Sequence, residues 1–225
     1  MNQNQSIYLV MMIKLKEGAE SAFGQFVIKN APLLKKHNIH LLKSFSIQLK
    51  GQLVAQNNLP QPDVVSIFEF ATMESFMAYM SDPDYLEVAA LRAEATSSVI
   101  GYFSYPLGLP EQSASAVDPQ ARLYVVGLAN FHQQNESGID EFNRQAISRG
   151  LFSQHGMHLE MQLKPFKSVV VVGDAVVKTP DRIQVFYIGG MDAMKGYVSD
   201  PLYKELSPLR DNTLTQYDFF AGQLK

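Results

Sequence analysis

Residues 79–92 read YMSDPDYLEVAALR, and residues 197–210 read YVSDPLYKELSPLR. Eight positions are identical between the two stretches, and every one of them recurs at the same offset of 118 residues. The identical residues of the first copy are Tyr79, Ser81, Asp82, Pro83, Tyr85, Glu87, Leu91 and Arg92. Two matching stretches in register indicate that the chain contains an internal duplication.

Each copy predicts the first turns of a helix. Asp82 suits the N-cap, where its carboxylate accepts a free backbone N–H. Pro83 follows at the first helical position, where its missing N–H costs nothing. Tyr85 and Arg92 then lie on one face of the helix because they are seven residues apart. The second copy repeats this pattern, except that Pro208 is expected to strain or break its helix near the end.

The length and composition favour two soluble units. The 225 residues fit two domains of about 110 residues each, which we place at 1–108 and 120–225 with a linker at 109–119. The 19 basic and 22 acidic residues form no basic patch that predicts a nucleic-acid partner. The chain has no cysteine, which excludes disulfides and thiolate chemistry and fits a reducing compartment.

No stretch of the sequence predicts a membrane partner. The apolar run 7–13 is too short for a membrane span or for a signal sequence with its cleavage site. We therefore expect a cytoplasmic protein.

The order of elements repeats in the two halves. The first half predicts strands at 7–13, 40–48, 63–70 and 97–105, with helices at 19–37, 73–80 and from 83. The second half predicts strands at 122–131, 158–163 with 168–172, 182–188 and 214–220, with helices at 139–154, 191–198 and from 201. Each half thus has the β-α-β-β-α-β order of a ferredoxin-like unit, whose sheet leaves one face to be covered by the other unit.

This order, with a Pro-x-Tyr helix that ends in Leu-Arg, resembles the dimeric α+β barrel superfamily. Within it the chain is most similar to uncharacterised small bacterial domains, which are usually single units that dimerise. The resemblance implies an α+β fold in which two ferredoxin-like repeats form an intrachain barrel, a pseudo-dimer. Relatives include cofactor-free monooxygenases, haem-binding enzymes and isomerases of small lactones, so the resemblance leaves the chemistry open.

Arg92 and Arg210 are the first candidate functional residues. Each shares a helix face with a tyrosine, and that face should point toward the sheet, so we expect Arg92 to be at least half buried. A guanidinium there can clamp the carboxylate or phosphate of a ligand. The alternative is a structural ion pair with a protein carboxylate such as Glu69 or Glu87.

Tyrosines recur at equivalent places in the two halves. Tyr8 and Tyr124 lie near the starts of the first strands, whereas Tyr85 and Tyr203 lie on the duplicated helix. Their hydroxyls can hydrogen-bond a polar group of a ligand inside an apolar pocket. They can equally be core aromatic residues whose hydroxyls are satisfied within the protein.

Two histidine pairs are also offset by 118 residues. His37 and His40 are repeated as His155 and His158. The pairs can bind a metal or move protons, or they can mark the ends of helices. Asn38 and the matching glycine tolerate the left-handed conformation that follows a helix, so we favour helix capping and predict no metal site.

The sequence therefore predicts binding of a small molecule, with catalysis on a small, partly apolar acid without a cofactor as one form of it. The alternative is a non-catalytic binding or structural module. No catalytic residue is predicted. Apart from the ligand, the expected partner is a second copy of the chain in a homodimer of pseudo-dimers. The predicted ligand-binding residues are Arg92, Tyr85, His40, Tyr8, Arg210, Tyr203, His158 and Tyr124.

Overall fold

Strands from both halves of the chain close into one barrel. The structure, a computed structural model, describes residues 6–54, 59–113, 116–174 and 176–225. Residues 1–5 of the predicted first unit and 114–115 of the predicted linker lie outside the described residues. Within the described chain, neighbouring strands are antiparallel and follow the order β1-β3-β2-β8-β5-β7-β6-β4.

The first half contains β1 (Ile7–Leu15), α1 (Glu20–Lys36), β2 (His40–Val54), β3 (Val64–Phe70), α2 (Met73–Met80), α3 (Pro83–Ala95) and β4 (Thr96–Pro106). The second half contains β5 (Leu123–Phe131), α4 (Ser137–Ser148), α5 (Leu151–Gln154), β6 (His158–Val172), β7 (Arg182–Ile188), α6 (Met191–Ser199), α7 (Pro201–Asp211) and β8 (Leu214–Leu224). Short 3₁₀ turns are formed by Pro119–Ala121 and His132–Gln134. The predicted α+β barrel built from two β-α-β-β-α-β halves is confirmed.

Two seams join the halves. Strand β2 pairs with β8, and β4 pairs with β6, each in antiparallel register. The sequence predicted that one sheet packs on the other. In the structure the two sheets are also hydrogen-bonded to each other, through the edge strands β2 and β8 and the edge strands β4 and β6. The interior is filled with apolar side chains from both halves, including Val10, Phe45, Tyr102, Val126 and Phe220.

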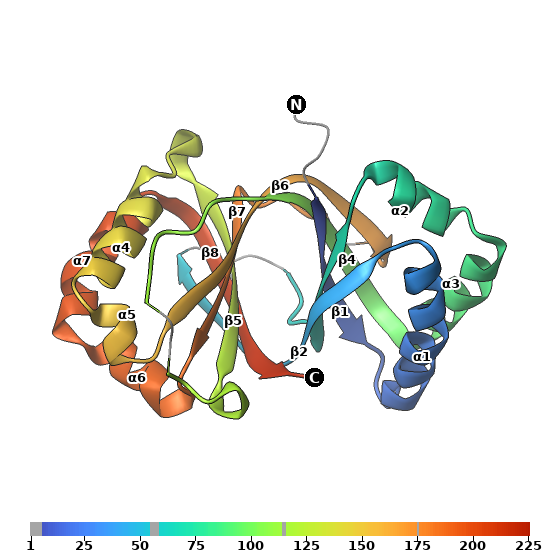
Figure 1. Ribbon diagram of the computed structural model, residues 1–225, viewed down its shortest axis with the longest axis horizontal. Coiled ribbons are helices and arrows are strands. Elements are labelled where there is room, and N and C mark those ends of the chain that lie inside the picture. The colour runs from blue at the N-terminus through green and yellow to red at the C-terminus, as the bar shows by residue number, and fades with distance from the viewer. Residues whose placement is uncertain (1–5, 55–58, 114–115, 175) are drawn as a thin grey trace.

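The helices cover the outside of the barrel. Figure 1 shows α1, α2 and α3 on one side and α4 to α7 on the opposite side, with the strands between them. Strand β1 is therefore buried on both faces: Leu9 packs against the helices and Val10 packs inside the barrel. None of the described helices combines the length and apolar character that a membrane span requires.

The predicted helix signals are present in the structure. Asp82 accepts a hydrogen bond from the backbone N–H of Asp84 at 3.0 Å, and Asp200 accepts one from Leu202 at 2.7 Å. Thr72 caps α2 in a reciprocal capping box with Ser75.

Three local predictions differ from the structure. Helix α7 runs through Pro208 to Asp211, so the proline does not end it. The helix predicted at 139–154 is divided, because Gly150 adopts a left-handed φ of 83°. The two segments predicted at 158–163 and 168–172 form one strand, β6, in which Pro165 sits beside a register shift that tolerates its missing N–H.

We predict that Gly222→Ala weakens the β2–β8 seam. A Cβ added there would lie 1.9 Å from the backbone oxygen of Ser46, which cannot move without disturbing β2. The free energy of unfolding should fall by about 1–3 kcal/mol or more, measured by chemical denaturation. Gly24→Ala is the control: this residue lies in α1 with nothing within 4 Å of the added atom. It should gain about 0.5–1 kcal/mol, and equal effects of both variants would contradict the prediction.

Candidate functional site

A cavity of about 300 Å³ lies between the helices of the first half and the outer face of the sheet. Helices α1, α2 and α3 contribute one wall, and β1, β3, β4 and β6 contribute the other. Most of the lining is apolar and includes Leu9, Met11, Ile13, Phe26, Leu34, Phe68, Phe70, Phe76, Met80, Phe103 and Val169. Such a surface favours the apolar body of a small molecule.

Four polar residues line the same cavity: Asn30, Tyr79, Tyr85 and Arg92. The Tyr79 hydroxyl donates a hydrogen bond to Asn30 Oδ1 at 2.8 Å, and Arg92 Nη1 donates one to the Tyr85 hydroxyl at 2.8 Å. The two tyrosine rings meet edge to face, with centroids 4.8 Å apart. Burial raises the pKa of Tyr79 above its usual value, so this hydroxyl keeps its proton at neutral pH.

Arg92 is partly buried, as predicted, but it lacks the protein carboxylate that the ion-pair alternative required. Among the described residues, none supplies a carboxylate within ion-pair distance of its guanidinium. Its Nε is buried, and no described residue accepts a hydrogen bond from it. The two acids proposed as partners lie elsewhere, because Glu69 accepts a hydrogen bond from Tyr8 and Glu87 is exposed.

The second half has a matching but smaller cavity of about 90 Å³. Tyr203 and Arg210 line it, and Arg210 Nη2 donates to the Tyr203 hydroxyl at 3.1 Å. In contrast to Arg92, Arg210 Nε also donates to Asp211 Oδ1 at 2.7 Å. Burial alone would lower the pKa of Arg210, but neighbouring Tyr203 and Asp211 outweigh it and raise the pKa.

The other four predicted residues lie on the opposite face of the sheet. Tyr8 and Tyr124 pack with the barrel interior, and Tyr8 donates to Glu69 Oε1 at 3.3 Å. His158 stacks on a tyrosine of β7, whereas His40 is exposed. The eight predicted residues are thus divided among two cavities and one end of the barrel, and they do not form a single site.

The other two histidines of the predicted pairs, His37 and His155, connect neighbouring helices. His37 Nε2 lies 2.7 Å from Asp82, the N-cap of α3, and His155 makes the same contact with Asp200 at 2.8 Å. Asn38 has a φ of 54°, as the capping interpretation predicted. No group of three metal-ligating side chains was found among the described residues.

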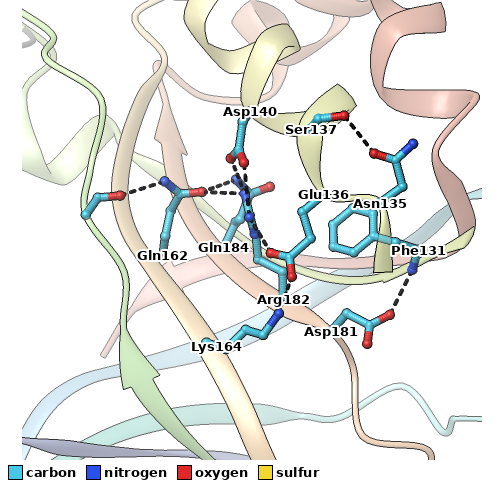
Figure 2. A network of polar contacts seen from close by, with 11 residues as sticks. Phe131, Asn135, Glu136, Ser137, Asp140, Gln162, Lys164, Asp181, Arg182 and Gln184 are labelled. Carbon is cyan, nitrogen blue, oxygen red and sulfur yellow. Dashed lines mark hydrogen bonds and ion pairs between the residues drawn. The ribbon is translucent and has the colours of Figure 1, made fainter. Parts of the chain in front are cut away.

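A polar network in the second half was not predicted from the sequence. Figure 2 shows Arg182 of β7 pointing toward Glu136, next to α4, and toward Asp140 within α4. Gln162 and Gln184 complete the network on the strands, and Lys164 pairs with the same glutamate. The position matching Arg182 in the first half is Val64, so the network belongs to one half only. Its charges are paired with one another, which favours a structural role.

Two of the four polar residues that line the first cavity, Asn30 and Tyr79, were not predicted from the sequence. Asn30 interrupts the apolar stripe of α1, which otherwise buries Phe23, Phe26 and Leu33. That interruption is a signal that sequence reasoning could have used. Tyr79 belongs to the duplicated stretch, but its contact with Asn30 depends on tertiary packing.

We predict that Asp82→Asn lowers the melting temperature by several degrees at neutral pH. Hydrogen bonds from Lys36 and His37 lower the pKa of Asp82 from 3.8 to about 2. The carboxylate's contribution to stability is therefore complete above about pH 4 and is lost as pH falls toward 2. Melting curves from pH 2 to pH 7 should show a smaller pH dependence for this variant. Asp84→Asn removes an exposed acid from the same turn, and a similar loss in that control would refute the prediction.

No protein-family profile matches this sequence, and no curated protein matches it. Solved structures do resemble the fold. A proposed monooxygenase from Fusobacterium nucleatum has a TM-score of 0.58 at 10% identity, with 100% of this chain and 94% of the other covered. Another from Lactobacillus acidophilus has a TM-score of 0.54 at 12% identity, with 98% and 94% covered.

An anthrone oxidase-like protein gives a TM-score of 0.57 at 7% identity, with 99% of this chain and 93% of the other covered. At such identities these similarities show the fold and leave the reaction open. They agree with the α+β barrel fold over 98–100% of this chain.

Proposed function

We propose that the first-half cavity binds one small, mostly apolar organic acid, with the acidic group held at Arg92. The observation that carries the proposal is an arginine that lines an apolar cavity without a carboxylate partner among the described residues. A partly buried cation is normally paired, because removal from water is costly. An acidic group on a ligand would supply the missing pair through a charge-assisted hydrogen bond.

The other polar residues support this orientation. Tyr85 is 5% exposed and fixes the guanidinium through the hydrogen bond to Nη1. Asn30 and Tyr79 provide an amide and a hydroxyl beside the apolar walls, where a second polar atom of the ligand can be recognised. The volume of about 300 Å³ lies at the small end of ligand pockets, which favours a ligand the size of one or two rings.

We extend the proposal to a reaction of the bound acid without a resident cofactor. The descriptions of two fold neighbours as proposed monooxygenases, and of another as anthrone oxidase-like, favour oxidation by dioxygen as the reaction to test. Incubation of a bound acid with the protein in air and under nitrogen, followed by mass spectrometry, tests this extension. An unchanged ligand in both conditions favours the non-catalytic binding module instead.

The unit boundaries at 1–108 and 120–225 are part of the same proposal. The shared order of elements supports them. Within the proposed linker, the Gln112 side chain accepts a hydrogen bond from the N–H of Leu159 and donates one to its carbonyl.

We predict that naphthoate raises the melting temperature of the protein, whereas the neutral naphthalene carboxamide, of similar shape, does so much less. Arg92→Ala should abolish this difference and weaken naphthoate binding at least about tenfold, which corresponds to about 1.4 kcal/mol. Its melting temperature without ligand should change little, because no protein carboxylate loses a partner. Thermal shift and calorimetry provide both measurements.

The control for this prediction is Arg144→Ala, which removes an exposed arginine of α4 far from the cavity lining. It should bind naphthoate as the wild-type protein does. Equal shifts with the acid and the amide, or an undiminished shift in Arg92→Ala, would show that Arg92 does not hold an acid.

A further inference from the structure

The two tyrosine–arginine corners have the same construction. The centroids of Tyr79 and Tyr85 are 4.8 Å apart, as are those of the matching tyrosines in the second half. The guanidinium carbon lies 5.6 Å from the Tyr85 ring in one half and 5.5 Å from the Tyr203 ring in the other. Each guanidinium also donates to the hydroxyl of its tyrosine. Because these contacts are shared, a difference in the remaining partners of the two arginines is informative.

That difference is a carboxylate. Asp211 Oδ1 accepts a hydrogen bond from Arg210 Nε at 2.7 Å and also lies 2.7 Å from Nη2, whereas no described residue accepts one from the buried Nε of Arg92. The residue after Arg92 is Ala93, so the first half lacks the carboxylate at the matching position. One corner therefore contains a carboxylate from the protein itself, and the other corner does not.

We propose that Asp211 is a built-in substitute for the acidic group of the ligand, so that the chain has one ligand site instead of two. This inference rests on the proposed function of the first cavity. Asp211 pairs with Arg210 and neutralises the charge that would otherwise attract a second acid. Phe142 and Tyr217 also enclose this guanidinium, and the neighbouring cavity has only about 90 Å³. Residue 93 in one half and residue 211 in the other thus determine which arginine is available.

The first test places the substitute in the first half. Ala93→Asp should supply an internal competitor for Arg92 and weaken naphthoate binding at least about tenfold by calorimetry. Ala93→Asn is the control, because it has the same size without the charge, and it should bind within about twofold of wild type. Lys16 Nζ donates a hydrogen bond to the carbonyl of residue 93 at 2.8 Å. A longer side chain at this position could disturb that contact, and Ala93→Asn reports such an effect without adding a charge. Wild type should bind one naphthoate per chain, and two equivalent sites would overturn the inference.

The second test removes the substitute from the second half. Asp211→Ala should lower the melting temperature, because the buried Arg210 loses its acid. Sodium formate, which carries a carboxylate small enough for the vacated position, should raise the melting temperature of this variant more than that of wild type at equal ionic strength with chloride. If Asp211→Ala does not fold, Asp211→Ser also vacates the position of the carboxylate and should show the same formate effect. No greater effect of formate on the variants than on wild type would overturn the inference.

These tests separate the two claims. If wild type binds neither naphthoate nor other carboxylates, the proposed function fails, whereas the formate experiment still reports on Asp211. If wild type binds naphthoate but Ala93→Asp and Ala93→Asn bind it equally well, the proposed function stands and the role of Asp211 as a substitute is wrong.

Discussion

Closure of the barrel is the constraint on which the other features depend. Each half has a four-stranded sheet, and only the pairing of β2 with β8 and of β4 with β6 completes the ring. The interior is then filled by apolar side chains from both halves. The proposed ligand cavity lies on the outer face of the sheet, between the sheet and helices α1, α2 and α3. The wall of that cavity even includes β6, a strand from the other half.

An ion pair also connects the two halves of the barrel. Lys43 of β2 and Glu160 of β6 form an ion pair with an N–O distance of 3.0 Å, although their strands stand four positions apart in the ring of eight. This pair connects the two halves through the inside of the barrel. The tyrosines near this end are thereby part of a packed layer, and Lys43 lies over the ring of Tyr124 at 5.2 Å. Sequence repetition does not show which face of the sheet a residue lies on, and it therefore grouped these tyrosines with the cavity residues.

The sequence predicted the architecture well because its signals are local. The Asp-Pro caps, the apolar strands and the left-handed residue after α1 each act within a few positions, and each recurs in the second half. The candidate site was predicted in part: Tyr85 and Arg92 share a helix face, so their spacing brought them together. The contact between Tyr79 and Asn30 joins residues 49 positions apart, and no local pattern specifies it. The Arg182 network depends in the same way on where β7 packs against α4.

Covalent connection of the halves has a consequence for how the protein can change. In a barrel formed by two identical chains, every substitution appears twice, and each subunit must fit its own copy. Here a substitution alters one half only, and the matching residue of the other half is unchanged. The valine at 64 and the arginine at 182, or the alanine at 93 and the aspartate at 211, show such single-sided divergence. Because the two halves also meet within one molecule, dilution cannot separate them, and assembly of the barrel is independent of protein concentration.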